Sequence, residues 1–563
     1  MTTIDRSGRA AVGANAAIAV ALVVLLAAVA LVAKPPAPPG IAEFAPQAAQ
    51  AITKAPPGQS SQFGRGATSC SGGPCLGLAT TTTLPGATTT VVPVTTPGAP
   101  VIAGVPSSLQ CFTWPDGAVT QTFDPQSPPC VPDWPQAARG NGGATSPGVT
   151  ATSIRIGIAG SSSEPPAAAL LTFFNQHFEL YGRQLVAVDD AVASTGIGPQ
   201  YEHAQAVQDL EDHEFAAIFG DYTQDDDLPY LSALAQERVI GVNAYSTNVT
   251  TRQLVSMAPF AWSYYPTVDQ QELNLGQFSC RALVGHPASQ AGESSLRSAT
   301  RSFAVLYPDP DGANAIPVGT LQSALGTCGA SLPSDEYEGY VQADAQGVSQ
   351  PSQQNDELML ALKSKGVTTV YVTGRSVDTF NALSAANLVG YHPEWVIFNT
   401  ADYYDGAYTA TAPTQLSSMS GIAYWNKELP AITDVGDESF SEEAAPINWS
   451  DEYESLYKAL LLVASGIQAA GPDLTPTTFA NGLDNLAFPN PEADSAPTFP
   501  ARVGFSKSSP AMVDDFGLWS WQPGGMDYSA APAARNTGAY CYVGGGKRWS
   551  LGSWPTQDPW PAC

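Results

Sequence analysis

The chain of 563 residues exceeds the size at which one hydrophobic core stops growing, so several folded modules or a large non-globular part are expected. Charged residues make up only 13% of it, and the formal net charge is −28 at pH 7. A surface this acidic repels phosphate backbones and anionic headgroups, which argues against nucleic acid or peripheral membrane binding by the folded part.

The first segment, residues 1–34, contains the uncharged apolar run AAIAVALVVLLAAVALVA at positions 16–33. This run has about the minimum length of a transmembrane helix. Arg6 and Arg9 precede it and Lys34 follows, which favours a cytoplasmic N-terminus and an extracytoplasmic folded domain. We therefore predict a single-pass signal anchor in the cell membrane. A cleavable signal peptide is the alternative, although its apolar region is usually shorter, and no nearby cysteine supports a lipoprotein anchor.

The next segment, residues 35–110, is rich in Pro, Gly, Ala, Ser and Thr, as in TTTTLPGATTTVVPVTTPGAP. It has neither helical nor strand periodicity and cannot bury enough apolar surface to offset its chain entropy. We predict a disordered stalk here. Residues 111–148, which begin CFTWPDGAVTQTFDPQSPPCVPDW, are expected to form a small lead-in closed by Cys111 and Cys130.

The cysteines are even in number and lack the tight CxxC spacing of zinc sites, so disulfides in an oxidising compartment are expected. Pairing in chain order is one of roughly a hundred possible connectivities, and the sequence leaves the choice open. We predict one pair, Cys280 with Cys328, because one precedes the predicted strand FAVLYPD and the other ends the helix after it. The disulfide candidates are Cys70, Cys75, Cys111, Cys130, Cys280, Cys328, Cys541 and Cys563.

An alternation of strands and helices begins at residue 153 with SIRIGIAG, a β-branched run that ends in glycine. The following AALLTFFNQHFELYG places its apolar residues on one helical face. The alternation continues, and a second round starts at RSFAVLYPD. The pattern predicts an α/β fold over residues 149–530, with two doubly wound lobes and a cleft between them. Residues 531–563 remain as a Cys- and Trp-rich tail.

Several segments resemble the type I periplasmic-binding fold of ABC-transporter receptors, especially actinobacterial members similar to those for branched-chain amino acids. They are PPCVPDWPQAARGNGGATSPGVTATSIRIGI, FFNQHFELYGRQL, FAAIFGDY, VIGVNAYSTN, FAVLYPDPDG, GVTTVYVTG and ANLVGYHPEWVIFNT, within about residues 108–530. The resemblance implies that the lobes capture a small polar molecule, such as an amino acid, for an ABC permease. One departure is SSSEPPAAA, which stands where the family often has a Gly-rich stretch.

The resemblance also implies that loops at the strand ends hold the ligand. Hydroxyls and carboxylates there suit an ammonium or another polar head, while tyrosines and an arginine suit stacking or pairing. Each residue also fits an ordinary loop or helix cap. The predicted ligand-binding residues are Ser161, Ser162, Asp221, Thr223, Ser246, Thr247, Tyr264, Asp309, Arg375, Asp402 and Tyr403.

Enzymatic activity is not expected. The five histidines are scattered without metal-ligand spacing, and no G-x-S-x-G elbow accompanies them. We expect no cofactor and no metal. The alternative function is a membrane-tethered ligand sensor or surface structural module with the same fold.

Overall fold

The computed structural model describes Thr88–Thr89 and most of residues 111–560, which belong to one compact unit, Ala55–Cys563. The predicted membrane segment and nearly all of the stalk lie outside the described residues. None of the described helices is long and apolar enough to span a bilayer. Within 111–560 the positions left out are 123, 135–139, 160–164, 191–198, 220–226, 244–248, 309–317, 333–336, 341–349, 374–375, 399–412, 425–450, 492–500, 523–538 and 545.

The first lobe is built on a five-stranded, fully parallel sheet in the order β5-β4-β6-β7-β8. Its strands are β4 (Ser153–Ala159), β5 (Gln184–Asp190), β6 (Ala216–Phe219), β7 (Ile240–Asn243) and β8 (Ala261–Ser263). The connecting helices are α4 (Pro165–His177), α6 (Pro199–Glu211), α7 (Asp227–Glu237) and α8 (Thr251–Ser256). The predicted strand SIRIGIA therefore forms with the expected alternation, and Ile154, Ile156 and Ile158 are buried on one face.

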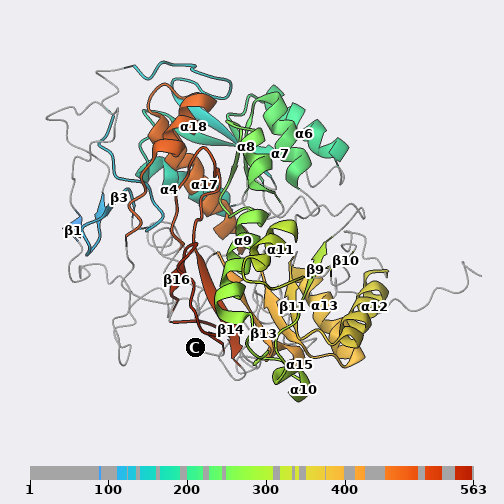
Figure 1. The fold of residues 1–563 in the computed structure, drawn as a ribbon. Coiled ribbons are helices and arrows are strands. Elements are labelled where there is room, and N and C mark those ends of the chain that lie inside the picture. Colours follow the sequence, from blue (N-terminus) through green and yellow to red (C-terminus); the bar gives the residue numbers. More distant parts are fainter. Residues whose placement is uncertain are drawn as a thin grey trace, which may run out of the picture. The chain divides into compact units, whose positions relative to one another are not determined.

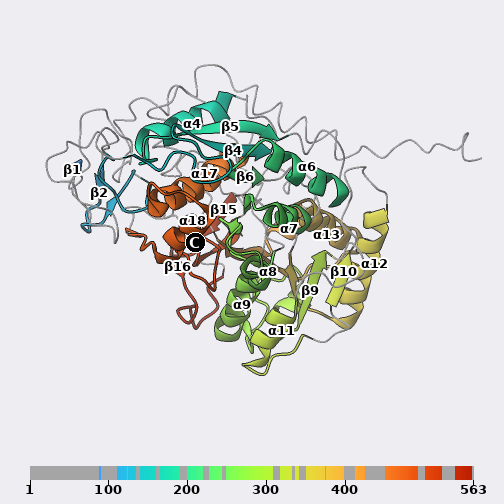
Figure 2. The same ribbon diagram turned by 90° about the horizontal axis from the view of Figure 1, so that it is seen from above.

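Helices cover both faces of this first sheet. One face packs against α4 and against α17 (Asp451–Ala470), which returns to the first lobe late in the chain with α18 (Pro476–Asn485). Figure 2 shows α4 beside β4 and β5, with α17 next to it. The other face packs against α6 and α7 through a separate core that includes Tyr230, Leu231 and Leu234.

The second lobe has an eight-stranded sheet in the order β10-β9-β11-β12-β13-β14-β15, with β16 also paired to β14. The strands from β10 to β13 are mutually parallel, whereas β14 is antiparallel to β13, β15 and β16. The strands are β9 (Phe303–Pro308), β10 (Tyr337–Tyr340), β11 (Thr369–Val372), β12 (Glu394–Ile397), β13 (Met419–Ala423), β14 (Phe516–Gln522), β15 (Ala539–Tyr542) and β16 (Arg548–Trp549).

The second sheet is also covered on both faces. In β9, Phe303, Val305 and Tyr307 join one core while Ala304 and Leu306 join the other, as the two-residue period of a strand requires. Figure 1 shows α9 beside α11, and α12 beside α13, against this sheet. The helices are α9 (Val268–Phe278), the π-helix η2 (Ser279–Leu283), α10 (Ser294–Arg297), α11 (Val318–Gly326), α12 (Gln350–Lys365), α13 (Ser376–Val389) and α15 (Pro413–Leu416). The predicted doubly wound pattern is confirmed in both sheets.

Three crossing segments connect the lobes. The first runs from β8 to α9 (residues 264–267), the second from β13 to α17 (424–450, of which only Tyr424 is described), and the third from α18 to β14 (486–515). The first and third lie side by side. The Ser263 amide donates to the Pro510 carbonyl at 3.1 Å, the Met512 amide to the Ser263 carbonyl at 2.9 Å, and the Val513 amide to the Tyr264 carbonyl at 3.1 Å.

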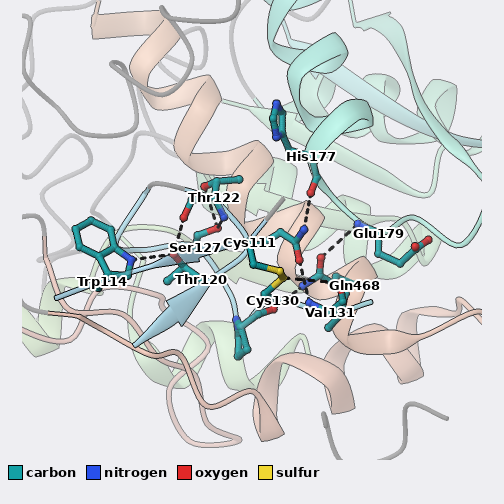
Figure 3. The surroundings of a disulfide bond; sticks show 12 residues. Cys111, Trp114, Thr120, Thr122, Ser127, Cys130, Val131, His177, Glu179 and Gln468 are labelled. Atoms are coloured by element: carbon teal, nitrogen blue, oxygen red, sulfur yellow. Dashed lines mark hydrogen bonds between the residues drawn. A yellow bond between two sulfur atoms is a disulfide. The ribbon is translucent and has the colours of Figure 1, made fainter. Parts of the chain in front are cut away.

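The stapled lead-in, residues 111–148, forms β2 (Phe112–Thr113) and β3 (Val119–Thr120), which make a three-stranded antiparallel sheet with β1 (Thr88–Thr89). Cys111 and Cys130 form a disulfide (Figure 3). On α17, the Gln468 side-chain amide donates to the Pro129 carbonyl at 2.9 Å, which docks the lead-in on the first lobe.

The predicted disulfide between Cys280 and Cys328 is confirmed, and it links η2 to the loop after α11. Cys541 is also disulfide-bonded, whereas Cys70, Cys75 and Cys563 lie outside the described residues. The tail supplies β15 and β16, so its chain extends the second sheet.

We predict that Gly466→Ala destabilises the first lobe. An added Cβ at this position of α17 would lie 2.2 Å from Cε2 of the Phe479 ring on α18, a distance at which something must move. Overpacking of this kind costs about 1–3 kcal/mol, measured as a lower midpoint of thermal or urea unfolding. Gly326→Ala is the control, because no atom lies within 4 Å of a Cβ added there. Equal midpoints for the two variants would contradict the prediction.

Candidate functional site

Each sheet has a point at which the direction of strand addition reverses. In the first sheet β4 lies between β5 and β6, and in the second sheet β9 lies between β10 and β11. After β5 the chain therefore crosses to the other side of β4, and after β10 it crosses to the other side of β9. In open α/β sheets this reversal creates a crevice outside the carboxyl ends of the strands, where ligands bind.

The predicted ligand-binding residues, apart from Tyr264, fall in gaps between described residues. Each gap opens within one residue of the carboxyl end of a parallel strand. These residues are Ser161 and Ser162 after β4, Asp221 and Thr223 after β6, Ser246 and Thr247 after β7, Asp309 after β9, Arg375 after β11, and Asp402 and Tyr403 after β12. Their positions lie outside the described residues, so their contacts stay predictions.

The strands before these residues are neighbours. In the first sheet β4, β6 and β7 are consecutive and parallel, and in the second sheet β9, β11 and β12 are. The carboxyl ends of parallel strands meet at one edge of a sheet. We therefore expect the hydroxyl and carboxylate residues that follow these strands in the sequence to gather at one edge of each sheet, near the reversal points. Such a set can supply several hydrogen-bond partners to one small polar molecule.

Tyr264 is described and lies in the first crossing segment. Its side chain is fully buried, and its hydroxyl donates to Gln126 Oε1 at 2.8 Å. Its ring also makes an edge contact with Tyr265, with 5.0 Å between centroids. Tyr264, predicted as a ligand-binding residue, is therefore bonded through its hydroxyl to the stapled lead-in in this structure. No sequence pattern singles out Gln126, because it lies in an irregular, proline-rich stretch.

Neighbouring aromatic side chains fill the region where the crossing segments meet. The Tyr265 ring lies 4.9 Å from the Tyr424 ring, and its hydroxyl is 3.3 Å from Ser455 Oγ on α17. These buried residues belong to the same core as residues of both sheets. Tyr264, Tyr265 and Tyr424, which belong to the first two crossing segments, are therefore packed as core.

A buried carboxyl group contacts helix α11 of the second lobe. Glu272, on α9, is fully buried, and its Oε2 accepts the Leu321 amide of α11 at 3.0 Å. Helix α11 begins at Val318, directly after the gap that contains Asp309, so Glu272 binds the first described element after that gap. Burial raises the pKa of Glu272 to about 8, because the charged form loses hydration, and nearby Asp269 raises it further.

Within the residues that the structure describes, no group of three or more His, Cys, Asp or Glu side chains is arranged to hold a metal ion. Two buried arginines form ion pairs with carboxylates of the fold. Arg301 pairs with Glu394 at 2.7 Å and with Asp558 at 2.6 Å, and Arg548 pairs with Asp515 at 2.7 Å. These pairs satisfy buried charges within the fold.

We predict that Glu272→Gln removes part of the pH dependence of stability. In the unfolded chain Glu272 ionises near its ordinary pKa of 4.5, whereas in the folded protein it keeps its proton up to about pH 8. The unfolded state therefore binds fewer protons between these values, and the contribution of Glu272 to stability falls as the pH rises. Glutamine can still accept the Leu321 amide but does not ionise.

The midpoint of thermal unfolding of Glu272→Gln, relative to the parent, should rise progressively from about pH 5 to pH 8. Glu211→Gln on the exposed side of α6 is the matched control and should track the parent throughout. A constant difference between Glu272→Gln and the parent over this range would show that Glu272 does not titrate there.

Comparison with known proteins gives one family. The model of the periplasmic binding protein family matches residues 199–522. No curated protein matches the chain.

Among similar solved structures is a fatty acid ABC transporter substrate-binding protein from Thermomonospora curvata, which is 14% identical with a TM-score of 0.46 and covers 72% of this chain and 94% of its own. A leucine-binding protein from Thermotoga maritima is 10% identical with a TM-score of 0.46, and the coverage is 70% of this chain and 99% of its own. A substrate-binding protein of an ABC transporter from Aeropyrum pernix is 11% identical with a TM-score of 0.48, at 71% and 97% coverage. Because the family model spans more than half of the sequence, the chain belongs to the periplasmic binding protein family.

Proposed function

We propose that this protein is an extracytoplasmic solute-binding protein that captures a small polar molecule between its lobes and passes it to an ABC permease. The observation that carries the proposal is the topology of the two sheets. Each sheet has a point where strand order reverses, and its neighbouring parallel strands are followed in the sequence by hydroxyl and carboxylate residues. Membership of the periplasmic binding protein family supports the same role.

The ligand class follows from the side chains in these loops. Ser246 and Thr247 in the first lobe offer hydroxyls, and Asp402 in the second offers a carboxylate. A carboxylate in a desolvated site favours a cationic partner, such as the ammonium group of an amino acid. Arg375 would pair with an anionic group of the same molecule. An amino acid or a related zwitterion is therefore the proposed ligand.

A thermal-shift screen tests this class directly. A ligand present at about 100 times its dissociation constant stabilises the folded state by roughly 2.7 kcal/mol, which is easily measured. A library of amino acids, amides and small carboxylates should include at least one compound that raises the unfolding midpoint in proportion to its concentration. If none of them does, the proposed ligand class is wrong.

We predict that Thr247→Ala and Asp402→Ala each weaken binding of the compound that the screen identifies. Removing one partner of a buried polar group costs about 1–3 kcal/mol, which is roughly tenfold to a hundredfold in dissociation constant. Isothermal titration calorimetry measures the loss. Both variants should unfold at nearly the same temperature as the parent without ligand, since loop residues contribute little to the core.

Thr172→Ala is the matched control for Thr247→Ala, because Thr172 is exposed on α4 and its hydroxyl donates only to the Ala168 carbonyl within that helix. It should bind as the parent does. If Thr247→Ala and Asp402→Ala also kept the affinity of the parent, the binding site would lie elsewhere.

We also propose that the protein stays attached to the cell membrane through residues 1–34. The apolar run at 16–33 supports this location, and so do the disulfides Cys111–Cys130 and Cys280–Cys328, since such bonds persist in oxidising compartments. The full chain should sediment with membranes and resist extraction by carbonate. A cleaved N-terminus, seen by mass spectrometry of the mature protein, would support the signal-peptide alternative instead.

A further inference from the structure

The stapled lead-in reaches the crossing segments through one buried side chain. The side-chain nitrogen Nε2 of Gln126 donates to the Ala501 carbonyl in the third crossing segment at 3.0 Å. The side-chain oxygen Oε1 accepts the hydroxyl of Tyr264, which belongs to the first crossing segment. Gln126 is 1% exposed, so both bonds are sheltered from water. A single residue of the lead-in thus links two of the three connections between the lobes.

A second residue of the lead-in binds the chain where it re-enters the first lobe. Asp124 Oδ2 accepts a hydrogen bond from the hydroxyl of Tyr457, in the first half of α17, at 2.8 Å. Asp124 Oδ1 accepts one from the backbone amide of Gln126 at 2.8 Å. Helix α17 follows the second crossing segment. Since the Cys111–Cys130 disulfide closes this part of the lead-in, Asp124 and Gln126 are held in one covalently restrained turn.

The C-terminal strap, which we define as residues 539–560, makes the corresponding contacts from the second lobe. Arg548 Nε donates to Asp515 Oδ1 at 2.7 Å, at the end of the third crossing segment. Its Nη2 donates to the Tyr424 carbonyl at 2.7 Å, at the start of the second, and to the Asp515 carbonyl at 2.6 Å. The Arg548–Asp515 pair is buried, with 2% of each side chain exposed.

The strap is itself anchored on the second lobe. Asp558 pairs with Arg301, which also binds Glu394 at the start of β12. Trp554 and Trp560 pack against Phe278 at the end of α9, with ring centroids 5.4 Å and 5.1 Å from its own. The guanidinium of Arg548 therefore connects the crossing segments to a fixed part of that lobe.

We propose that the stapled lead-in and the C-terminal strap brace the crossing segments from the two lobes, so that Gln126 and Arg548 limit how freely the lobes move about them. Both elements lie beyond the two-lobed alternation that the sequence predicts. Movement at a hinge changes backbone angles in the few residues that connect the rigid parts. Gln126 and Arg548 bond to those residues or to their immediate neighbours, and they act as positioning residues that do not contact a ligand.

Hydrogen exchange of the full chain without ligand tests the brace. The amides of Ser263, Met512 and Val513 pair the end of β8 and the first crossing segment with the third, so their exchange reports opening of this pairing. Gln126→Met keeps the side-chain volume but removes both bonds. Arg548→Lys keeps the charge beside Asp515 but loses the planar guanidinium, whose separate N–H groups bond to Asp515 and to the Tyr424 carbonyl at the same time. Each variant should accelerate exchange of the three amides roughly tenfold, while amides in the centres of β4 and β11 keep the parent rate.

Two matched controls separate bracing from general loosening. Gln121→Met alters the same lead-in, but Gln121 bonds to His177 and Val131 and to no crossing segment. Ser553→Ala alters the same strap, but the Ser553 side chain bonds to Ser550 within the strap and to no crossing segment. Both should leave the Ser263, Met512 and Val513 amides at the parent rate.

The proposal is overturned if Gln126→Met and Arg548→Lys leave these three amides unchanged, or if the control variants accelerate them equally. Should Gln126→Met fail to fold because it leaves Tyr264 without its acceptor, Arg548→Lys still decides the matter. Because no ligand is needed, the outcome is independent of whether the protein binds an amino acid.

Discussion

The structure depends on how the chain satisfies its backbone hydrogen bonds where it passes between two separate sheets. Tyr264, Tyr265 and Tyr424 of the crossing segments are packed among buried aromatic rings, where an unpaired amide or carbonyl is costly. The third segment pairs with the end of β8 and with the first segment, through the amides of Ser263, Met512 and Val513. Side chains of the stapled lead-in and the C-terminal strap, Gln126 and Arg548, bind further carbonyls at Ala501, Tyr424 and Asp515.

The same region explains why one hydrophobic core extends into both lobes. Tyr264, Tyr265, Tyr424 and Tyr457 share a core with residues of both sheets, whereas the opposite face of each sheet has its own smaller core. Tyrosine suits this place because its ring buries apolar area while its hydroxyl bonds to a nearby polar group. Close-packed interiors resist continuous deformation, so movement of the lobes must preserve or exchange these contacts.

Buried charge follows a consistent rule in the second lobe. Arg301 and Arg548 each have a carboxylate partner, because an unpaired buried charge would be far more costly than a paired one. Glu272 has no cationic partner among the described residues, and its raised pKa keeps it protonated instead. Arg548 lies next to the second and third crossing segments, and Glu272 bonds to the helix that follows the gap containing Asp309.

Local pattern in the sequence was enough to predict the strands SIRIGIA and FAVLYP, the helices between them and the pairing of Cys280 with Cys328, because period-two and helical spacing reflect which face each residue buries. The same pattern placed the candidate loops after parallel strands, since a strand end is visible in the sequence. The role of Tyr264 was not predictable. Its hydroxyl acceptor, Gln126, lies 138 residues away, in a stretch with no periodicity. The partners of Arg548 and the burial of Glu272 were hidden for the same reason. Contacts between distant segments depend on how two sheets and three crossings pack together, which only the tertiary structure decides.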